Sequence, residues 1–198
     1  IDFMWISDAL TPEEAVAILK KNEAGKAARE AEMRRDGFPA YTTSTGWLGY
    51  PDDKVRRLAR EGAAAGWTHF KIKVGRDLED DRRRCSVLRR EMGDEAHMMI
   101  DANQVWDVPQ AIEWIRELAP FRPWFVEEPT SPDDILGQRA IAEAVKPIRI
   151  ATGEMCHNRI MFKQFMQCGA LQVCQLDCCR LGGVNEVMAV LLLAARFD

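Results

Sequence analysis

Short apolar runs alternate with amphipathic stretches along the chain after Pro39. After one such run, Leu78, Cys85, Leu88 and Met92 recur at spacings of 7, 3 and 4, which places them on one face of a helix. We predict six strand–helix units, which together indicate a parallel sheet. The predicted strands lie at residues 41–45, 69–74, 98–101, 124–127, 148–153 and 171–176, and the helices at 55–65, 78–92, 107–118, 135–145, 161–168 and 184–197.

The first 39 residues carry helix signals instead. Thr11 precedes Pro12, and Glu14 stands three positions after Thr11, which is the pattern of a capped helix start. A charged stretch then continues to Arg35, with a break at Gly25. We therefore predict a helical N-terminal segment before the alternating region begins.

From the second to the sixth predicted strand, each strand end carries a side chain that can act as an acid, a base or a ligand. These residues are Lys73, Asp101, Glu127, Glu154 and Asp177, separated by 28, 26, 27 and 23 residues. A barrel of eight strand–helix units in about 250 residues repeats roughly every 31 residues, with its active site at the carboxyl ends of the strands. A Rossmann sheet also fits the alternation, but no glycine-rich phosphate loop follows the first strand. We predict an α/β fold of the TIM-barrel type.

Asp101, Glu127 and Glu154 end three successive predicted strands. Neighbouring strands lie about 4.8 Å apart, so the three carboxylates converge on a space that a hydrated cation can fill. Oxygen ligands suit a hard cation such as Mg²⁺, which keeps positions open for water or substrate oxygens. One such carboxylate alone is better explained as a helix cap or surface residue, but three in register indicate a metal site.

Lys71 and Lys73 alternate on the second predicted strand, so their side chains point to the same face. With Phe70 and Ile72 directed at the helices, the two lysines face the barrel interior. Burial and a second nearby cation both disfavour an ammonium charge, so one lysine can act as a base near neutral pH. A substrate carboxylate on Mg²⁺ has a more acidic α-proton, and the metal stabilises the enediolate left by its removal. The alternative is a solvated lysine pair.

Composition narrows the class of protein. The 198 residues are 47% hydrophobic and include 27 basic and 31 acidic side chains, with a formal net charge of −4. These values are typical of a soluble globular chain and argue against a nucleic-acid binder. No apolar run reaches the roughly 18 to 20 residues of a membrane span. The six cysteines lack zinc or disulfide spacing, so we expect packed, reduced thiols and a reducing compartment, either cytosol or mitochondrial matrix.

Five motifs occur in order between Tyr41 and the end of the chain: K-I-K-V-G, I-D-A-N-Q-V-W, V-E-E-P, T-G-E, and an aspartate before R-L-G-G-V. In this order they resemble the mandelate racemase subgroup of the enolase superfamily. The resemblance implies Mg²⁺ as the cofactor and a Lys or His base. It implies that Asp101, Glu127 and Glu154 are the metal ligands. Lys73 would be the base, and Lys71 would lie beside it at the substrate carboxylate. Glu128 would be a structural partner, and Asn103 would lie near the metal or the substrate.

Asp177 indicates the subgroup. Muconate-cycloisomerase-like and enolase-like members carry a lysine at the end of the sixth strand. Racemase-like members carry an aspartate there, which orients a catalytic histidine at the end of the seventh strand. That histidine is expected beyond Asp198. Of the histidines present, His69 and His97 begin strands and are expected to be structural, and His157 follows the third expected ligand.

The segments P-A-Y-T-T-S-T-G-W-L-G-Y, M-I-D-A-N-Q-V-W-D-V and A-T-G-E-M-C-H-N-R resemble the L-fuconate dehydratase family, in particular its vertebrate mitochondrial branch. This resemblance implies a hydro-lyase of carbohydrate catabolism that converts L-fuconate to 2-keto-3-deoxy-L-fuconate in the mitochondrion. Lys73 would remove the C2 proton, and the expected histidine would protonate the departing 3-hydroxyl. Trp47 and Trp106 are expected either at the wall of the sugar pocket or packed beneath a loop.

The resemblance also implies how the chain is organised. Residues 1–39 are expected to be the helical part of an N-terminal capping domain, and residues 40–198 the first six strands of a partial barrel. Ile1 is not an initiator methionine and Asp198 ends an apolar helix without a cap, so we expect a fragment. Its two unpaired sheet edges predict a poorly soluble or inactive chain when isolated.

The expected partner is a small-molecule acid sugar, with no nucleic acid and no membrane, and a homo-oligomer is an open alternative for the full-length protein. Three other functions also stay open. Another acid-sugar dehydratase or a racemase of the same subgroup would share the core motifs. A non-catalytic truncated isoform or regulator would keep the residues without turnover. A Schiff-base aldolase using Lys73 fits the barrel but leaves the clustered carboxylates unexplained.

Overall fold

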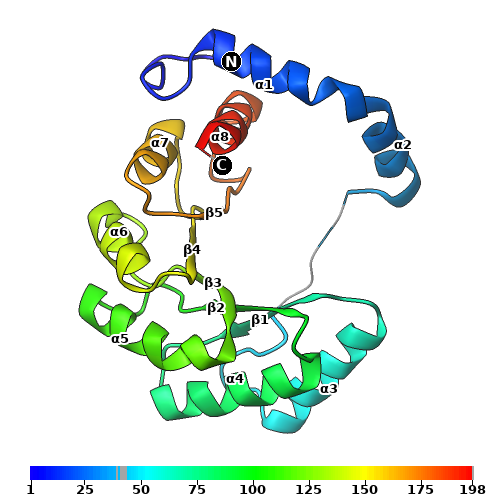
Figure 1. Cartoon of the computed structure of the whole chain (residues 1–198), viewed down its shortest axis with the longest axis vertical. Coiled ribbons are helices and arrows are strands. Elements are labelled where there is room, and N and C mark those ends of the chain that lie inside the picture. The colour runs from blue at the N-terminus through cyan, green and yellow to red at the C-terminus, as the bar shows by residue number, and fades with distance from the viewer. Residues whose placement is uncertain (39, 41–43, 198) are drawn as a thin grey trace. The chain divides into compact units, whose positions relative to one another are not determined.

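The structure is a computed structural model that describes residues 1–38, 40 and 44–197 (Figure 1). The chain forms two compact units. The larger unit comprises Ser44–Met155 and Cys168–Gln175, and the smaller comprises Ile1–Thr43, Cys156–Gln167 and Leu176–Asp198. None of the helices in the described ranges is long and apolar enough to cross a membrane.

The larger unit is built on a parallel sheet. Its strands are β1 (His69–Lys73), β2 (His97–Asp101), β3 (Pro123–Glu127), β4 (Arg149–Thr152) and β5 (Val173–Cys174). They are hydrogen-bonded in the order β1-β2-β3-β4-β5, so each strand is added beside the one that precedes it in the sequence. A doubly wound sheet reverses this order part-way, whereas a barrel does not. The predicted α/β fold with barrel-type connectivity is therefore confirmed.

In the larger unit, aspartate side chains cap the starts of the helices at residues 78–92, 108–118 and 135–144. The side chain of Asp77 accepts a hydrogen bond from the backbone N–H of Asp80, and that of Asp107 accepts one from the N–H of Gln110. Such bonds satisfy donors that the first helical turn leaves free. The helices of the larger unit are α3 (Asp52–Ala64), α4 (Leu78–Met92), α5 (Val108–Leu118), the 3₁₀ helix η2 (Ala119–Phe121) and α6 (Ile135–Ala144).

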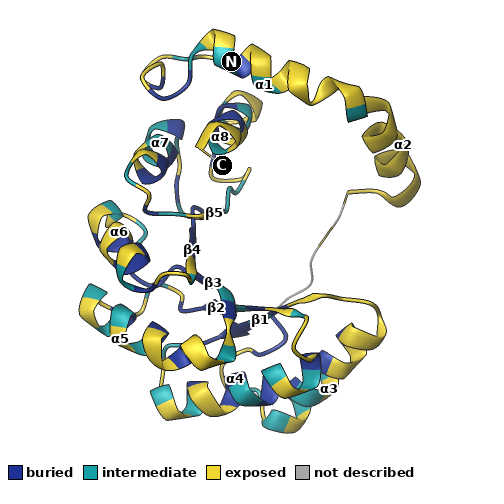
Figure 2. Ribbon diagram, in the orientation of Figure 1, coloured by how far each residue is buried: buried dark blue, intermediate teal, exposed yellow. Residues whose placement is uncertain are grey.

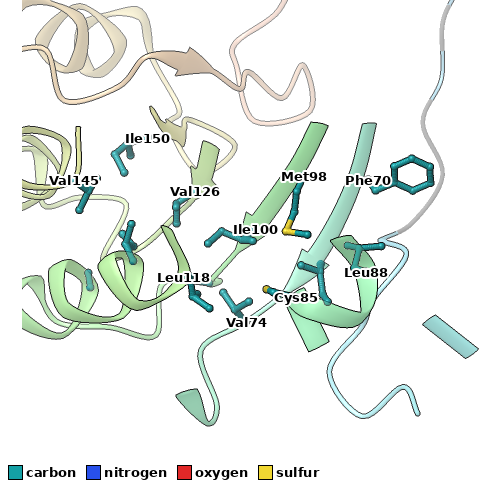
Figure 3. Packing of buried hydrophobic residues seen from close by; sticks show 14 of the residues in the cluster. Phe70, Val74, Cys85, Leu88, Met98, Ile100, Leu118, Val126, Val145 and Ile150 are labelled. Carbon is teal, nitrogen blue, oxygen red and sulfur yellow. The ribbon is translucent and has the colours of Figure 1, made fainter. Parts of the chain in front are cut away.

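Alternate residues of β1 and β2 pack against the helices of this unit (Figure 3), and Figure 2 shows buried positions on the strands and on these helices. Phe70 and Ile72 of β1 and Ile100 of β2 join a core cluster that includes Cys85 and Leu88 of α4. Each of these five residues is at most 1% exposed. The predicted apolar face of the helix at residues 78–92 is thus confirmed. Because side chains alternate along a strand, the residues between these core positions face the other side of the sheet.

The smaller unit contains the remaining helices. The expected cap at Thr11 is confirmed, because its side chain accepts a hydrogen bond from the N–H of Glu14, whose carboxylate accepts one from the N–H of Thr11. Arg159 is 8% exposed and forms ion pairs with Asp2 and Glu186, which join the start of the chain to two helices. The helices are α1 (Pro12–Lys21), the 3₁₀ helix η1 (Glu23–Gly25), α2 (Lys26–Asp36), α7 (Arg159–Gln167) and α8 (Val184–Phe197).

The first and last predicted strands differ from the observed elements. Residues 41–43 of the first lie outside the described residues, and the described pairing nearby is a single parallel bridge between Gly46 and Ile72. The last is reduced to Val173–Cys174. Two further ladder bonds flank it, from the N–H of Gln172 to the carbonyl oxygen of Ile150 and from the N–H of Gln175 to that of Thr152. The chain then enters a turn. The predicted domain boundary between residues 39 and 40 stays a prediction.

Candidate metal and acid–base site

Three predicted site residues stand in one row across neighbouring strands. The strand register pairs Lys73 of β1 with Asp101 of β2, and Asp101 with Glu127 of β3. Each is the last residue of its strand, and all three are buried. The nearly equal length of the strand–helix units thus brings a lysine and two carboxylates side by side.

Two lysines hold the two buried carboxylates through hydrogen-bonded ion pairs. The Nζ atom of Lys73 lies 2.5 Å from Oδ2 of Asp101, and Nζ of Lys71 lies 2.7 Å from Oε2 of Glu127. The Nζ atom of Lys71 also lies 3.3 Å from Oδ2 of Asp101. Buried charges require partners of opposite sign, and these contacts supply them. Both lysines therefore face the side of the sheet that carries the carboxylates, as predicted.

The ion pairs change the acid–base behaviour of the row. Burial, followed by the negative charge of Asp101, raises the pKa of Glu127 above its ordinary value. Burial alone would lower the pKa of Lys71, but its hydrogen bond to Glu127 and the charges of Glu127 and Asp101 outweigh burial, so this pKa is raised. These carboxylate partners therefore favour the charged form of Lys71.

Glu154 is placed differently from the other two predicted metal ligands. The register pairs Glu127 with Ala151, three positions before Glu154. Gly153 follows the end of β4 with a φ angle of 131°, and Glu154 lies exposed on the loop beyond it. Within the described ranges, Asp101, Glu127 and Glu154 are not a group whose ligand oxygens all lie within 4.8 Å of one another. Their assignment as metal ligands stays a prediction.

Glu128 adds a further acid to this cluster. Its side chain is 1% exposed, and burial raises its pKa to about 7, an effect to which the charges of Glu154, Asp101 and Glu127 add. Its Oε2 atom accepts a hydrogen bond of 2.8 Å from the side chain of Gln104, whereas Oε1 is buried without a partner in the described structure. Buried polar atoms are almost always paired, so this Oε1 atom is an oxygen that a cation could bind.

The loops after β2 and β3 adopt a conformation that is rare for residues other than glycine. Asn103, Gln104 and Glu128 have φ angles of 47°, 68° and 43°. The N–H of Gln104 donates to the carbonyl oxygen of Glu128 at 2.8 Å, and the N–H of Asn103 donates to Oδ1 of Asp101 at 2.9 Å. Such strain is found where a structure holds a functional group in place. Here it positions two carboxylates, while the side chain of Asn103 is exposed.

The two tryptophans expected at a sugar pocket have different surroundings. Trp106 is 3% exposed, and its ring packs edge-on against Trp114 at a centroid distance of 5.5 Å. The structure therefore favours the packing alternative for Trp106. Trp47 is 41% exposed, and its ring centroid lies 5.1 Å from Nζ of Lys73, a distance typical of cation–π contacts. Trp47 borders the lysine side of the site.

Asp177 belongs to the smaller unit, at the start of the turn over residues 178–180. It is half-buried, and its Oδ1 atom accepts a hydrogen bond of 2.8 Å from the N–H of Cys179. Its catalytic role stays a prediction. Cys178 and Cys179 are exposed, so the expectation of packed thiols is wrong for these two residues, because the turn directs them away from any core.

His69 and His97 lie at the opposite ends of their strands from Lys73 and Asp101. His69 and His97 stand opposite each other at the starts of β1 and β2, with ring centroids 4.6 Å apart. Both rings also contact Trp124. This aromatic cluster agrees with the structural role expected for the pair. His157 is exposed on the loop before α7.

Sequence reasoning missed two residues that support the row. Gln175 follows β5, and its side chain forms a hydrogen bond with Glu127. Arg84 of α4 is 1% exposed, and its guanidinium group donates a hydrogen bond of 2.7 Å to the carbonyl oxygen of Lys73. A signal for Arg84 was available, because it stands four positions before Leu88 on the apolar face of α4. A charge on that face requires buried partners.

The donors of this cluster suit a hard dication. Two ammonium groups pair with two of the four carboxylates, which leaves an excess of two negative charges when all six groups are ionised. Every donor is an oxygen atom, as Mg²⁺ prefers, and the orphaned Oε1 atom belongs to the same cluster. The residues therefore fit the Mg²⁺ that the family resemblance implies. The six residues are Asp101, Glu127, Glu128, Glu154, Lys71 and Lys73.

Comparisons with known proteins agree with this geometry. The family model described as enolase C-terminal domain-like matches residues 54–198. The L-galactonate dehydratase of Hypocrea jecorina is 57% identical over 202 residues, which cover 100% of this chain and 45% of that protein. Mitochondrial enolase superfamily member 1 of Homo sapiens is 55% identical over 200 residues, with the same coverage of 100% and 45%. The chain thus spans about half the length of the curated relatives it matches.

Solved structures lead to the same family. The crystal structure of human mitochondrial enolase superfamily member 1 matches with a TM-score of 0.92 at 55% identity, covering 100% of this chain and 45% of that one. L-talarate dehydratase from Polaromonas sp. JS666, complexed with Mg and L-glucarate, matches with a TM-score of 0.74 at 32% identity, covering 79% and 44%. Over most of its length the chain therefore belongs to the enolase superfamily, as a member of the enolase C-terminal domain-like family.

Proposed function

We propose that this chain supplies the base and the metal-binding residues of a Mg²⁺-dependent acid-sugar dehydratase. The observation that carries the proposal is the row of Lys73, Asp101 and Glu127 on adjacent strands, with Lys73 Nζ 2.5 Å from Asp101 Oδ2. A base beside carboxylates that fit Mg²⁺ suits removal of a proton next to a substrate carboxylate. The names of two relatives, an L-galactonate dehydratase and an L-talarate dehydratase, support dehydration.

The proposed reaction removes water from an acid sugar that carries hydroxyl groups on C2 and C3. Lys73 takes the C2 proton, the 3-hydroxyl group leaves as water after protonation, and the resulting enol rearranges to a 2-keto-3-deoxy acid. Bound Mg²⁺ would supply positive charge that acidifies the C2 proton and stabilises the developing negative charge. Lys71, which is charged beside Glu127, would bind the substrate carboxylate. Trp47, whose ring lies near the Lys73 ammonium group, would contact a face of the sugar.

L-fuconate is the substrate we favour. L-fuconate and L-galactonate share their configuration from C2 to C5 and differ only at C6, which is a methyl group in the first and a hydroxymethyl group in the second. The 57% identity to an L-galactonate dehydratase therefore supports an acid sugar of this configuration. A pocket that hydrogen-bonds the C6 hydroxyl would reject L-fuconate strongly, whereas an apolar pocket would discriminate weakly. The relatives named as mitochondrial support a mitochondrial location.

A 2-keto-acid assay with Mg²⁺ tests the proposal on L-fuconate, L-galactonate and L-talarate. It uses the 198-residue chain and a chimera that takes its remaining segments from the human relative. Lys73→Ala is compared with Lys20→Ala, which changes an exposed lysine of α1. We expect chelation and Lys73→Ala, but not Lys20→Ala, to abolish turnover. Exchange of the C2 proton for deuterium without loss of water would instead indicate a racemase. A folded chimera that binds Mg²⁺ but gives neither reaction would overturn the proposal.

A further inference from the structure

Two neighbouring cysteines are exposed on the turn that follows β5. Cys178 and Cys179 are both exposed, whereas Cys85 and Cys156 are buried. With Asp177, the exposed pair forms the one group of three metal-ligating side chains, in the part of the chain that the structure describes, whose ligand atoms all lie within 4.8 Å of one another. The proposed dehydration uses neither thiol.

The turn itself brings these side chains together. The carbonyl oxygen of Asp177 accepts hydrogen bonds of 3.1 Å from the N–H groups of both Arg180 and Leu181, which closes the backbone around the two cysteines. The Oδ1 atom of Asp177 accepts the N–H of Cys179 at 2.8 Å. The thiol of Cys179 in turn contacts the side chains of both Cys178 and Asp177. The three donors are therefore neighbours in space as well as in sequence.

We infer that Asp177, Cys178 and Cys179 bind a thiophilic divalent cation of the zinc and cadmium class. Thiolates select soft or borderline ions, and a carboxylate oxygen completes many zinc sites. Zinc lies about 2.3 Å from sulfur and about 2.0 to 2.2 Å from carboxylate oxygen, so two sulfurs on one ion stand roughly 3.8 Å apart in tetrahedral geometry. Ligand atoms already within 4.8 Å need only a small movement of exposed side chains to reach it.

This cation site differs in chemistry from the magnesium site of the larger unit. Mg²⁺ prefers oxygen donors, as offered around Asp101 and Glu127, and binds thiolate ligands weakly. With three protein donors, the site on the turn leaves one coordination position open to water or to another ligand. Binding would release the thiol protons, and it would compete with the orienting role that the family resemblance implies for Asp177.

Cadmium titration tests the inference on the intact chain, kept reduced with a phosphine and saturated with Mg²⁺. The readout is the ultraviolet sulfur-to-cadmium charge-transfer absorption, which carboxylate sites do not produce. The variants are Cys178→Ser, Cys179→Ser and Asp177→Asn. The matched control is Cys174→Ser, which alters a half-buried thiol of β5. Circular dichroism confirms that each variant keeps the fold.

We expect one Cd²⁺ per chain, bound more than about tenfold more weakly after either turn cysteine is replaced, since losing even a supporting group costs about 10- to 100-fold. Cys174→Ser should bind as the parent chain does. Asp177→Asn should weaken Cd²⁺ binding in the folded chain. In guanidinium, which unfolds the turn, the two adjacent thiols alone hold the ion, so the same substitution should leave binding unchanged. Equal charge-transfer titrations of the parent chain and the Cys178→Ser, Cys179→Ser double variant would overturn the inference, as would an unaltered affinity in folded Asp177→Asn.

Discussion

The guanidinium group of Arg84 donates a hydrogen bond of 2.7 Å to the backbone carbonyl oxygen of Lys73, the proposed base. It also donates to the carbonyl oxygens of Gly46 at 3.0 Å and Trp47 at 2.8 Å. Arg84 therefore joins α4 to the end of β1 and to the segment whose tryptophan ring lies near the Lys73 ammonium group. The base is held in place by a buried side chain of a neighbouring helix as well as by its own strand.

Replacing Arg84 by lysine should lower the free energy of unfolding by about 2 to 4 kcal/mol. A lysine ammonium group on this helix cannot reach all three carbonyl oxygens, and each buried polar group left unpaired costs about 1 to 3 kcal/mol. Urea unfolding followed by circular dichroism measures the loss. Arg82→Lys, on the exposed face of the same helix, should change stability by less than about 0.5 kcal/mol. Equal effects of the two substitutions would mean that the three bonds contribute little.

Asp81, on the same helix, should make stability depend on pH. Its side chain is fully buried, and burial raises its pKa to about 6, above the value of about 3.9 in an unfolded chain. A group whose pKa is higher in the fold contributes stability below about pH 4 and loses that contribution as the pH rises through about 6. We expect this contribution to the free energy of unfolding to fall by about 2 to 3 kcal/mol between pH 4 and pH 7.

Asp81→Asn should remove that fall, because asparagine keeps an oxygen acceptor for the N–H of Gly75 without a titrating charge. Urea unfolding at both pH values gives the comparison. Asp53→Asn, an exposed position on α3, should keep the pH dependence of the parent chain. A parent-like pH dependence in Asp81→Asn would assign the effect to another group.

The row of Lys73, Asp101 and Glu127 was accessible from the sequence because nearly equal strand–helix units end in the same layer of a parallel sheet. The position of Glu154 was not, because a short strand and the positive φ angle of Gly153 carry it past that layer. Spacing does not reveal how a chain turns after its strand. The same holds for the exposed turn cysteines, since cysteines are usually buried.

The supporting contacts were hidden for a different reason. Arg84 acts on backbone carbonyl oxygens, and the N–H of Gln104 bonds the carbonyl oxygen of Glu128. Backbone acceptors are present at every residue, so no sequence pattern singles out the ones that are used. Local signals did suffice where both partners lie within one turn, as in the cap formed by Thr11 and Glu14.

Lys73 competes with any cation for Asp101, so Lys73→Ala should bind Mg²⁺ at least about fivefold more tightly while losing activity. The Lys73 ammonium group lies 2.5 Å from Oδ2 of Asp101. A cation bound to Asp101 would therefore lie close to this ammonium group, and two like charges about 4 Å apart repel by about 1 kcal/mol or more. Isothermal titration calorimetry measures the affinity. Lys20→Ala should match the parent chain. Unchanged or weaker binding in Lys73→Ala would indicate that Mg²⁺ does not use Asp101.

Without Mg²⁺, the same Lys73→Ala substitution should destabilise the chain. It leaves Asp101, which is 1% exposed, with only the more distant Lys71 ammonium group at 3.3 Å. Breaking a buried pair from one side costs about 3 to 5 kcal/mol, and the remaining partner should reduce this to about 2 to 3 kcal/mol. Thermal melting with and without Mg²⁺ should therefore show a larger stabilisation by the metal in Lys73→Ala than in the parent chain.

Glu154 and Asp101 should respond differently to loss of charge, because one is exposed and the other buried. Glu154→Gln should weaken Mg²⁺ binding more than about tenfold, yet change the free energy of unfolding without Mg²⁺ by less than about 0.5 kcal/mol. Asp101→Asn should weaken both, because it leaves Lys73 without its acid partner. Glu113→Gln, at an exposed site on α5, should alter neither. If Glu154→Gln binds Mg²⁺ as the parent chain does, Glu154 is a surface acid and not a ligand, and Glu128, with its orphaned Oε1 atom, becomes the next carboxylate to test.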